Sequence, residues 1–527
     1  MVKQEKSKLR YTRRNFLKST GVGAAALALS SCGSSQGIQT TFAWDVSILR
    51  VDPKPMYELS PYLYMQFMEP LGVTDGSVEA AWDFKNDRWR EDVIEATKEL
   101  SPSMIRWGGL LSSYYRWKEG VGPRNKRVPM MNLVWGGVET NQVGTAEFVD
   151  FCRLVGAEPL MVVNFESEGR DEFKIDAKGS VRAAGYGEAR EWVDYCNNPG
   201  NRLRREHGFE QPHSIKLWQI GNETSYARGF DLETAASRTV TFAKEMRKAD
   251  PAIELIGWGD SGWAGRMIEV AGEHLQYVAF HHMFDPGAGD KKSLLRGIEY
   301  RKDPDLTWAY LMDGYKVHKA KIAKIRAETK GCDMPLAMTE CHYALGGRNR
   351  CEVLSTWAAG VSYARVLNVN ERNGEVLKIA TAADFCGTRW QVNAIMIPVP
   401  RGRSFMMPVA MVMSLYRNHT GDKAIDVTLA PDDLDVTASR TGERVFLHVA
   451  NTNRTQSVST RIAVDGMVVN SGKVFEIAIE PEYEVFEHRP EITSPKEKPL
   501  PKNRRWTFPA ASVSAVELEV HPRKNKT

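Results

Sequence analysis

The sequence predicts an α/β protein in which a (β/α)8 TIM barrel is followed by an antiparallel β-sandwich. Between about residues 60 and 390, short apolar runs alternate with amphipathic stretches of helical period. The runs are continuously apolar, which is typical of parallel strands covered by helices. After about residue 420 the pattern changes to short β-branched runs separated by Gly, Pro, Asn and Asp, which is typical of antiparallel strands.

The first region contains the strands and helices of the predicted barrel. The expected strands are Leu63–Pro70, Ser103–Gly109, Pro159–Phe165, Ile215–Glu223, Glu254–Asp260, Tyr277–Met283, Pro335–His342 and Leu377–Phe385. The expected helices include Arg90–Leu100, Ala146–Val155, Leu232–Lys248, Leu306–Lys330 and Glu352–Asn370. Strands of this number and spacing suit a closed barrel. An open doubly wound sheet is the main alternative, but no GxGxxG or GxxxxGK[ST] motif opens an early helix to support it.

The last region contains the strands of the predicted sandwich. They are Ile425–Leu429, Leu434–Thr437, Arg444–Asn451, Ser457–Val464, Lys473–Ile479 and Ser512–Val520. The early stretch Thr41–Asp52 also has strand character and is expected to join them, whereas Ser494–Lys502 reads as a surface loop. The chain is therefore expected to divide into a signal and tether (1–40), a strand joining the sandwich (41–59), the barrel (60–400) and the sandwich (401–527).

The N-terminus resembles an export signal. Thr12–Lys18 contains a twin-arginine pair, and the apolar run Gly21–Leu29 that follows is too short to span a bilayer, which needs about 20 residues. Leu29-Ser30-Ser31-Cys32 resembles a bacterial lipoprotein cleavage box with Cys32 as the lipidated residue. The Ser/Gly-rich stretch Ser30–Gly37 suits a flexible tether. We therefore expect export by the twin-arginine route and a periplasmic or cell-surface protein held in the membrane through Cys32.

Charge and cysteine content limit the kinds of partner, disulfide and metal site that the sequence supports. Of the formal net charge of +4, residues 1–31 contribute +6, so the rest of the chain carries −2 and gives no reason to expect a nucleic-acid partner. The six later cysteines form no CxxC pair and are expected to be free thiols. His281 and His282 are adjacent rather than spaced as helical zinc ligands, so neither a metal nor another cofactor is expected.

Two glutamates end predicted barrel strands. Glu223 ends the fourth run and Glu340 lies at the end of the seventh, and the catalytic groups of such barrels lie at carboxyl strand ends. Paired carboxylates supply the acid and the base or nucleophile that glycoside cleavage needs. Asn222, beside Glu223, offers an amide that can donate to a sugar hydroxyl. The pair therefore predicts a glycosidase.

Several motifs occur together in one order along the chain. They are Leu59–Gly72 with Glu69, Arg106-Trp107-Gly108-Gly109, Tyr115-x-Trp117, Gly120–Pro123, Trp135-x-x-Val138-Glu139-Thr140-Asn141-x-x-Gly144, Glu188–Asn197, Trp218–Glu223 and His281. Over about residues 60–480 they resemble glycoside hydrolase family 51, the α-L-arabinofuranosidases, retaining glycosidases of clan A.

The resemblance implies roles for individual residues. It implies that Glu223 is the general acid/base and Glu340 the nucleophile of a retaining mechanism, with their carboxyl groups about 5–5.5 Å apart. Arg106 is expected to stabilise the charge of Glu340, and Asn222 to contact the 2-hydroxyl of the sugar.

Three further residues, Glu69, Trp135 and His281, are expected to bind substrate by the same resemblance. Each has a structural alternative. Glu69 could pair with a barrel arginine, Trp135 could be a core residue, and His281 could be a buried histidine with its hydrogen bonds satisfied. The expected substrate is an arabinose-containing polysaccharide or oligosaccharide such as arabinan or arabinoxylan, cleaved from its end, and the resemblance leaves a homo-oligomer open.

The sequence departs from the family pattern around the sugar pocket. Leu110 replaces a frequent Asn, Met283 replaces a Tyr, Cys341-His342 replaces Trp-Asn, and Asp384 replaces a Gln. Because polar pocket groups determine sugar discrimination, a retaining enzyme for a xyloside, a galactofuranoside or a β-glucan is a second hypothesis. A non-catalytic carbohydrate-binding lipoprotein is a third.

Overall fold

The computed structural model describes residues 47–69, 75–226, 228–287, 294–346 and 351–523. The residues from Ser47 onward form one compact unit, which contains both predicted sheets. The twin-arginine stretch and Cys32 lie outside the described residues. No helix within these ranges combines the length and the apolar character that a membrane crossing requires.

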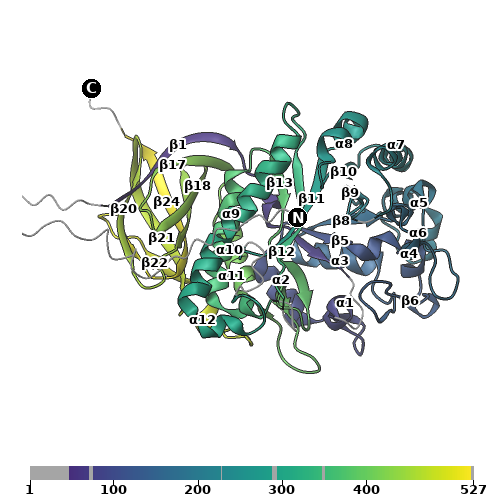
Figure 1. The fold of residues 1–527 in the computed structure, drawn as a ribbon, viewed down its shortest axis with the longest axis horizontal. Coiled ribbons are helices and arrows are strands. Elements are labelled where there is room, and N and C mark those ends of the chain that lie inside the picture. The colour runs from purple at the N-terminus through teal and green to yellow at the C-terminus, as the bar shows by residue number, and fades with distance from the viewer. Residues whose placement is uncertain (1–46, 70–74, 227, 288–293, 347–350, 524–527) are drawn as a thin grey trace, which may run out of the picture. The chain divides into compact units, whose positions relative to one another are not determined.

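The predicted barrel is present (Figure 1). Its strands, in chain order, are β2 (Gln66–Met68), β5 (Met104–Trp107), β8 (Glu158–Val163), β9 (Leu217–Ile220), β10 (Glu254–Trp258), β11 (Tyr277–Phe284), β12 (Leu336–Tyr343) and β13 (Leu377–Ala380). Each pairs in parallel with its neighbour in the chain. The backbone N–H of Met65 donates to the carbonyl of Ala380 at 2.9 Å, which joins the last strand to the first and closes the barrel.

Helices follow the strands and cover their outer faces. The longer ones are α2 (Glu91–Leu100), α3 (Thr145–Val155), α5 (Tyr186–Asn197), α7 (Leu232–Ala249), α8 (Ala264–Ala271), α9 (Pro304–Glu328), α10 (Trp357–Arg372) and α11 (Pro408–Asn418). Local sequence fixes several of their ends. The side chain of Asp231 accepts a hydrogen bond from the N–H of Thr234 and caps α7, while Arg247 and Lys248 complement the helix dipole in its last turn.

The eighth predicted strand is interrupted, contrary to the expectation of one run from Leu377 to Phe385. It divides into β13 and β14 (Asp384–Gly387). The hydroxyl of Thr381 donates to the carbonyl of Ala383 at 3.0 Å, and this local bond turns the chain between the two strands. β14 pairs with β2 and extends the sheet to β15 (Asn393–Met396) and β16 (Phe405–Met406).

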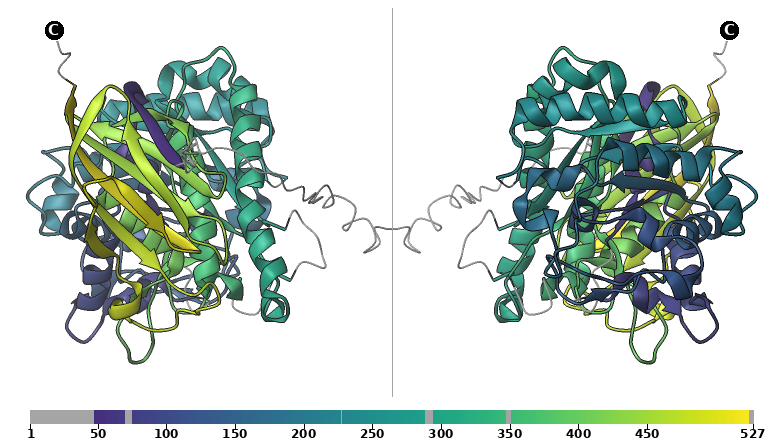
Figure 2. Two further views of the ribbon diagram at one scale, coloured as in Figure 1. Left: turned by 90° about the vertical axis from the view of Figure 1, so that its left-hand side faces the viewer. Right: turned by 90° about the vertical axis from the view of Figure 1, so that its right-hand side faces the viewer.

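The remaining strands form the C-terminal β-sandwich. They are β1 (Ile48–Glu58), β17 (Lys423–Leu429), β18 (Leu434–Thr441), β19 (Arg444–Asn451), β20 (Val458–Val464), β21 (Met467–Ala478), β22 (Lys496–Pro499), β23 (Arg505–Phe508) and β24 (Ser512–Pro522). A second apolar core, which includes Leu49, Ile425, Leu447 and Val516, lies between them. The N-terminal strand β1 pairs with β17 and β20, and Figure 2 shows it in purple among the yellow-green strands.

Two details of the sandwich differ from expectation. The stretch Ser494–Lys502, read as a surface loop, contains the exposed edge strand β22, which pairs with β21. Its Lys and Pro residues resemble a loop in sequence because edge strands carry such residues to discourage further pairing. Helix α11 packs on α2 and α10 of the barrel, so the barrel extends past residue 400, the expected start of the sandwich.

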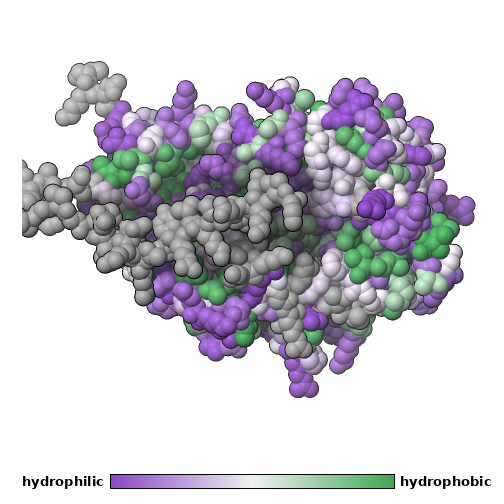
Figure 3. All heavy atoms as spheres, in the orientation of Figure 1, coloured by the Kyte–Doolittle hydropathy of each residue, from purple (hydrophilic) through white to green (hydrophobic). Residues whose placement is uncertain are grey.

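Short elements complete the chain. They are α1 (Ser77–Ala81), β3 (Trp82–Asp83), β4 (Arg88–Trp89), β6 (Met130–Met131), β7 (Val138–Glu139), α4 (Asp171–Lys174), α6 (Arg202–Glu206) and α12 (Pro490–Thr493). Hydrophilic side chains cover much of the face in Figure 3, and hydrophobic ones gather near α4 and β6. Exposed apolar residues in or beside these elements include Met131, Ile175 and Val181. All six cysteines of the described part are free thiols, as predicted.

Candidate active site

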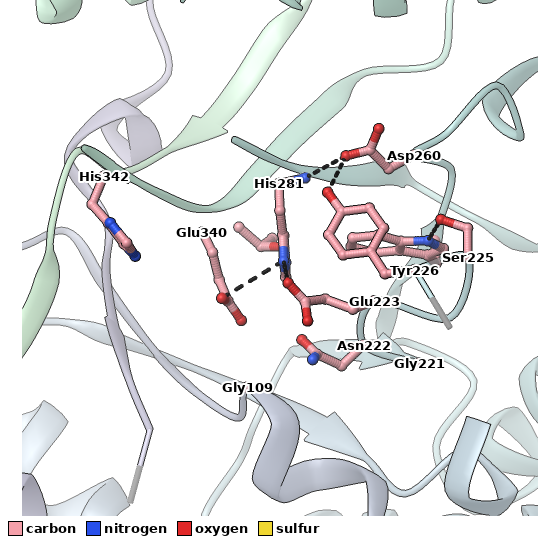
Figure 4. Close-up of polar contacts among 12 residues, drawn as sticks. Gly109, Gly221, Asn222, Glu223, Ser225, Tyr226, Asp260, His281, Glu340 and His342 are labelled. Atoms are coloured by element: carbon pink, nitrogen blue, oxygen red, sulfur yellow. Dashed lines mark hydrogen bonds and ion pairs between the residues drawn. The ribbon is translucent and has the colours of Figure 1, made fainter. Parts of the chain in front are cut away.

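The carboxyl ends of the barrel strands bring the two predicted glutamates together. Glu223 lies in the turn just after β9, Glu340 lies in β12, and His281 lies in β11, which stands between these two strands in the sheet. One ligand atom from each of these three buried side chains lies within 4.8 Å of the others. Figure 4 shows the three side chains pointing toward one another. The fold therefore brings three residues that are far apart in the sequence into one cluster.

Arg106, on β5, links Glu340 to Asn222, the residue beside Glu223. Its guanidinium is fully buried and donates to Glu340 Oε1 at 2.8 Å and to Asn222 Oδ1 at 2.6 Å. The third hydrogen bond, from Nε, goes to Gln219 Oε1 at 2.9 Å. Because a guanidinium presents its donors in one rigid plane, these three bonds fix Glu340 relative to Asn222.

Glu223 occupies a turn of unusual backbone conformation. Its φ is +54°, and Gly221 before it has φ of +82°, so the chain reverses sharply as it leaves β9. The carboxylate lies 3.1 Å from His281 Nδ1. Burial raises the pKa of Glu223 to about 7, despite the opposing charges of Arg170 and Arg106. A carboxyl group with this pKa is protonated in part of the population near neutral pH, as a general acid must be.

His281 is a neutral bridge between the two glutamates. Burial lowers its pKa to about 4. Its Nε2 lies 3.0 Å from the hydroxyl of Thr339, and its Nδ1 lies 3.1 Å from Glu223 and 3.6 Å from Glu340. If Nε2 accepts from the hydroxyl, Nδ1–H is directed at the carboxylates.

Glu69 approaches the site from the first barrel strand. It accepts hydrogen bonds from the N–H of Leu111 at 3.0 Å and from Trp135 Nε1 at 3.2 Å, and within the described ranges it makes no ion pair with an arginine. Burial and the nearby charge of Glu340 raise its pKa well above the usual value. Gly109 has φ of +80°, and a Cβ there would lie 2.4 Å from the Glu69 carboxyl carbon, so a glycine is needed.

Trp135 is half-buried, and its ring packs edge-on against Trp390 at 5.3 Å between centroids. Its indole thus contacts Glu69 while a part of its surface remains exposed, so it is not a fully buried core residue.

Asn222 has a buried amide that is only half used. Its oxygen accepts from Arg106, but its Nδ2 is buried and has no hydrogen-bond partner in the structure. Buried amide groups are rarely left unpaired. Figure 4 shows this amide beside Glu223 and facing the same space as Glu340, where a hydroxyl of a bound molecule can accept from it.

Sequence reasoning missed a supporting set around Asp260, at the end of β10. Asp260 accepts from Tyr226 Oη at 2.6 Å, from Lys321 at 2.6 Å and from the N–H of His281 at 3.2 Å. Although burial opposes ionisation, these donors lower its pKa. The available signal was position alone, since Asp260 ends an apolar run in the same way as Glu223.

Three of the residues that depart from the family pattern, Met283, His342 and Asp384, lie near the paired glutamates. Met283 and His342 are register partners on β11 and β12, two residues beyond His281 and Glu340, so they share the inner face of the barrel. His342 Nε2 lies 3.6 Å from Asp384 Oδ1. Leu110 follows Gly109 in a half-buried position.

Comparisons with known proteins agree with this geometry. The model of the alpha-L-arabinofuranosidase 1 domain matches residues 96–294, and that of the twin-arginine translocation pathway signal matches residues 10–30. An intracellular exo-alpha-(1->5)-L-arabinofuranosidase of Halalkalibacterium halodurans is 35% identical over 243 residues, which cover 42% of this chain and 45% of that protein. Alpha-L-arabinofuranosidase C of Emericella nidulans is 34% identical over 216 residues, covering 39% and 40%. The matched segment thus spans less than half the length of these relatives.

Solved structures extend the likeness to the whole fold. The alpha-L-arabinofuranosidase of Thermotoga maritima, solved as an arabinose complex, has a TM-score of 0.72 at 23% identity and covers 90% of this chain and 100% of that one. The family 51 enzyme of Thermotoga petrophila has a TM-score of 0.73 at 23% identity, with the same coverage. A family 44 xyloglucanase of Paenibacillus polymyxa is more distant, with a TM-score of 0.58 at 14% identity, covering 90% and 99%.

The barrel and the sandwich define the fold class as a (β/α)8 barrel with a C-terminal β-sandwich, and the paired carboxylates form a site whose residue types suit glycoside cleavage. Residues 96–294 match the alpha-L-arabinofuranosidase 1 domain, and the described fold is similar to that of a family 51 alpha-L-arabinofuranosidase. The chain also carries a twin-arginine export signal.

Proposed function

We propose that the protein is a retaining, exo-acting α-L-arabinofuranosidase that releases terminal arabinofuranosyl groups from arabinan, arabinoxylan or their oligosaccharides. The observation that carries the mechanism is the spacing of Glu223 and Glu340, whose nearest carboxylate oxygens lie within 4.8 Å. Retaining glycosidases hold their carboxyl groups about 5–5.5 Å apart, whereas inverting ones leave about 6.5–9.5 Å for a water molecule. The relatives named above support the choice of glycone.

In the first step, Glu340 attacks the anomeric carbon and Glu223 protonates the departing oxygen. The bond from the anomeric carbon to the leaving oxygen breaks as the bond to Glu340 forms, which gives a covalent glycosyl-enzyme. Arg106 orients the carboxylate of Glu340, since its guanidinium donates to Glu340 Oε1 at 2.8 Å. Glu223 suits the role of the acid, because burial raises its pKa and keeps it partly protonated.

In the second step, Glu223 acts as a base. It takes a proton from water, the water oxygen bonds to the anomeric carbon, and Glu340 leaves as a carboxylate. The product keeps the anomeric configuration of the substrate. His281 contacts both carboxylates and holds their relative positions through the two steps.

The remaining site residues are proposed to bind the sugar. The free Nδ2 of Asn222 would donate to the 2-hydroxyl, a contact that can strengthen in the transition state. Glu69 and Trp135, which are joined by a hydrogen bond of 3.2 Å, would also contact the glycone. No step requires a metal or an organic cofactor.

A retaining glycosidase with another glycone is the second candidate, because three residues of the inner face differ from the family pattern. Met283, His342 and Asp384 lie next to the catalytic pair, where they alter the polar groups that a sugar ring would meet. A site that hydrogen-bonds one hydroxyl pattern can reject another by a large factor. Xylosides, galactofuranosides and β-glucosides therefore belong in the test.

The localisation proposal concerns Cys32. We propose that signal cleavage before Cys32 is followed by its lipidation, so that the exported protein is membrane-anchored outside the cytoplasm. Mass spectrometry of the N-terminal peptide would detect the lipid, and Cys32→Ala should move the protein from the membrane to the soluble fraction. A homo-oligomer stays a prediction, to be measured by sedimentation.

The deciding experiment is hydrolysis of a panel of aryl glycosides by a form lacking residues 1–32. The panel contains the α-L-arabinofuranoside, β-D-xyloside, β-D-galactofuranoside and β-D-glucoside. We expect turnover of the arabinofuranoside, lost in Glu340→Ala. If only another glycoside is hydrolysed, its sugar takes the place of arabinofuranose in the proposal. If none is hydrolysed and sugar binding is retained, a non-catalytic carbohydrate-binding protein is favoured.

A further inference from the structure

The segment Glu166–Arg170, which follows β8, has a strained backbone. Glu166, Ser167, Glu168 and Gly169 are consecutive residues with φ between +52° and +73°. Residues other than glycine rarely adopt this left-handed conformation, and a run of three persists only where surrounding contacts impose it. The N–H of Glu166 donates to the carbonyl of Ala184 and the N–H of Ser167 donates to Asn164 Oδ1, while Glu168 contacts the turn that carries Glu223.

Glu168 contacts the residues on either side of Glu223. Its carboxylate is fully buried and accepts from the N–H of Asn222 at 3.0 Å and from the hydroxyl of Thr224 at 2.5 Å. Its backbone carbonyl accepts from the N–H of Phe230 at 3.0 Å. A Cβ on Gly229 would lie 2.0 Å from that carbonyl oxygen, so the glycine permits the close approach.

Arg170 contacts Glu223 itself. Its Nη2 donates to the backbone carbonyl of Glu223 at 2.5 Å, and the side chain is only 5% exposed. Its Nε has no hydrogen-bond partner, and among the described residues no carboxylate forms an ion pair with it. Burial raises the pKa of Glu223 and of Glu168, and the positive charge of Arg170 opposes that rise at both carboxyl groups.

We infer that Glu168 and Arg170 are positioning residues for the acid/base carboxyl of Glu223. Glu168 fixes the direction of the turn through Asn222 and Thr224, and Arg170 fixes its carbonyl and places a positive charge behind the Glu223 side chain. The role of Glu223 as acid/base rests on the proposed function. The geometry of the turn is independent of the proposed function, so the positioning of Glu223 and the proposed function can be tested separately.

The kinetic test of Glu168 compares two leaving groups on the glycone that the panel identifies. A 4-nitrophenyl glycoside departs with little protonation, whereas a methyl glycoside depends on the acid. In the full chain, Glu168→Gln should lower kcat/KM for the methyl glycoside by about 10- to 100-fold and change the nitrophenyl value by less than about threefold. Glu166→Gln is the matched control, since its carboxylate faces only Arg238 at 3.5 Å, and should change neither value.

An equal loss on both glycosides would assign Glu168 a merely structural role and overturn the inference, as would no loss on either. If no glycoside is hydrolysed, the proposed function fails, and crystal structures of Glu168→Ala and Glu168→Gln then decide. A turn from Gly221 to Thr224 that moves in either variant supports the inference. A turn unchanged in both overturns it.

The test of Arg170 is the pH profile. Loss of the positive charge in Arg170→Gln should raise the pKa of Glu223, so the alkaline limb of kcat/KM should move to higher pH than in the unchanged protein. Arg170→Lys retains the charge and should restore the limb toward its original position. A limb that does not move in Arg170→Gln would remove Arg170 from the inference, and carbon NMR titration of Glu223 gives the same reading without turnover.

Discussion

Arg106 Nη1 lies 2.8 Å from Glu340 Oε1, and the same guanidinium reaches Asn222 at 2.6 Å. One buried cation from β5 therefore connects the proposed nucleophile with the residue beside the proposed acid. Neither Glu340 nor Asn222 can move away from Arg106 without breaking one of these hydrogen bonds. This relationship leads to the first prediction.

Arg106→Lys should lower kcat by about 100-fold or more, because an ammonium cannot make the three directed bonds of the guanidinium. The matched control is Arg127→Lys. Arg127 also forms a buried ion pair, with Glu147 at 2.8 Å, but belongs to the outer loops. We expect both variants to lose thermal stability and only Arg106→Lys to lose kcat. A similar kcat in both variants would contradict the role of Arg106.

Glu223→Gln should stabilise the protein at alkaline pH. Folding raises the pKa of Glu223 from 4.5 to about 7, so the folded state binds this proton more tightly than the unfolded chain does. The stability that this group contributes is present below about pH 4.5 and is lost as the pH rises through about 7, at a cost of roughly 3 kcal/mol. A neutral amide avoids that cost.

The measurement is the melting temperature of the variant and of the unchanged protein at about pH 8 and about pH 4.5. The variant should be more stable at the higher pH and little different at the lower one. Glu340→Gln is the contrasting control. It should destabilise at both values because it leaves the buried Arg106 without its counter-charge. If Glu223→Gln and Glu340→Gln changed the melting temperature equally at both pH values, the prediction that the two glutamates lie in different electrostatic environments would be contradicted.

Glu223→Ala should show the two-step mechanism directly. Without the acid/base, the glycosyl-enzyme forms from an activated aryl glycoside but reacts slowly with water, so turnover should fall by about 100- to 10,000-fold. Added azide needs no general base and should restore turnover, giving a glycosyl azide with the configuration of the substrate. Product NMR checks this. An azide product of inverted configuration would contradict a covalent intermediate on Glu340.

A buried histidine pair between a barrel strand and a covering helix should make the protein sensitive to acid. His282 on β11 and His318 on α9 have ring centroids 5.3 Å apart, and burial lowers their pKa values to about 2 and about 4. Since these values lie below that of the unfolded chain, the stability they contribute is complete above about pH 6.5 and is lost as the pH falls toward 4.

His282→Phe should flatten this acid dependence, because phenylalanine can keep the stacking on Phe284 without binding a proton. Melting temperatures between about pH 4 and 7.5 test it. His521→Gln, near the end of β24 in the sandwich, serves as the control and should keep the slope. An unchanged slope in His282→Phe would contradict the prediction.

Much of the barrel could be predicted because its strands are continuous apolar runs, and this pattern is local. The positions of Glu223, Glu340 and Asn222 could be predicted for the same reason, since Asn222 and Glu223 follow one such run and Glu340 lies near the end of another. The break between β13 and β14 was not, because it depends on one hydroxyl bond of Thr381 inside an apolar run. The strands β22 and β23 were missed because edge strands resemble loops in composition.

Glu168 and Arg170 illustrate what a sequence pattern hides. In the stretch Glu166–Arg170 three of five residues are charged, which in a sequence is typical of a solvated loop. Burial of Glu168 depends on the turn after β9 and on the close approach of Gly229, which are more than fifty residues away. No local pattern reports such an approach.

The sequence by itself determined the order of the strands, the class of the fold and the position of two glutamates at the carboxyl ends of strands, because these follow from short apolar runs and from residues near their ends. Only the tertiary structure decided how those carboxylates differ. Glu223 owes its raised pKa to burial and Glu340 its ion pair to Arg106, which comes from another strand. Desolvation and Coulomb interactions act through space, so they depend on the closed barrel rather than on neighbours in the chain.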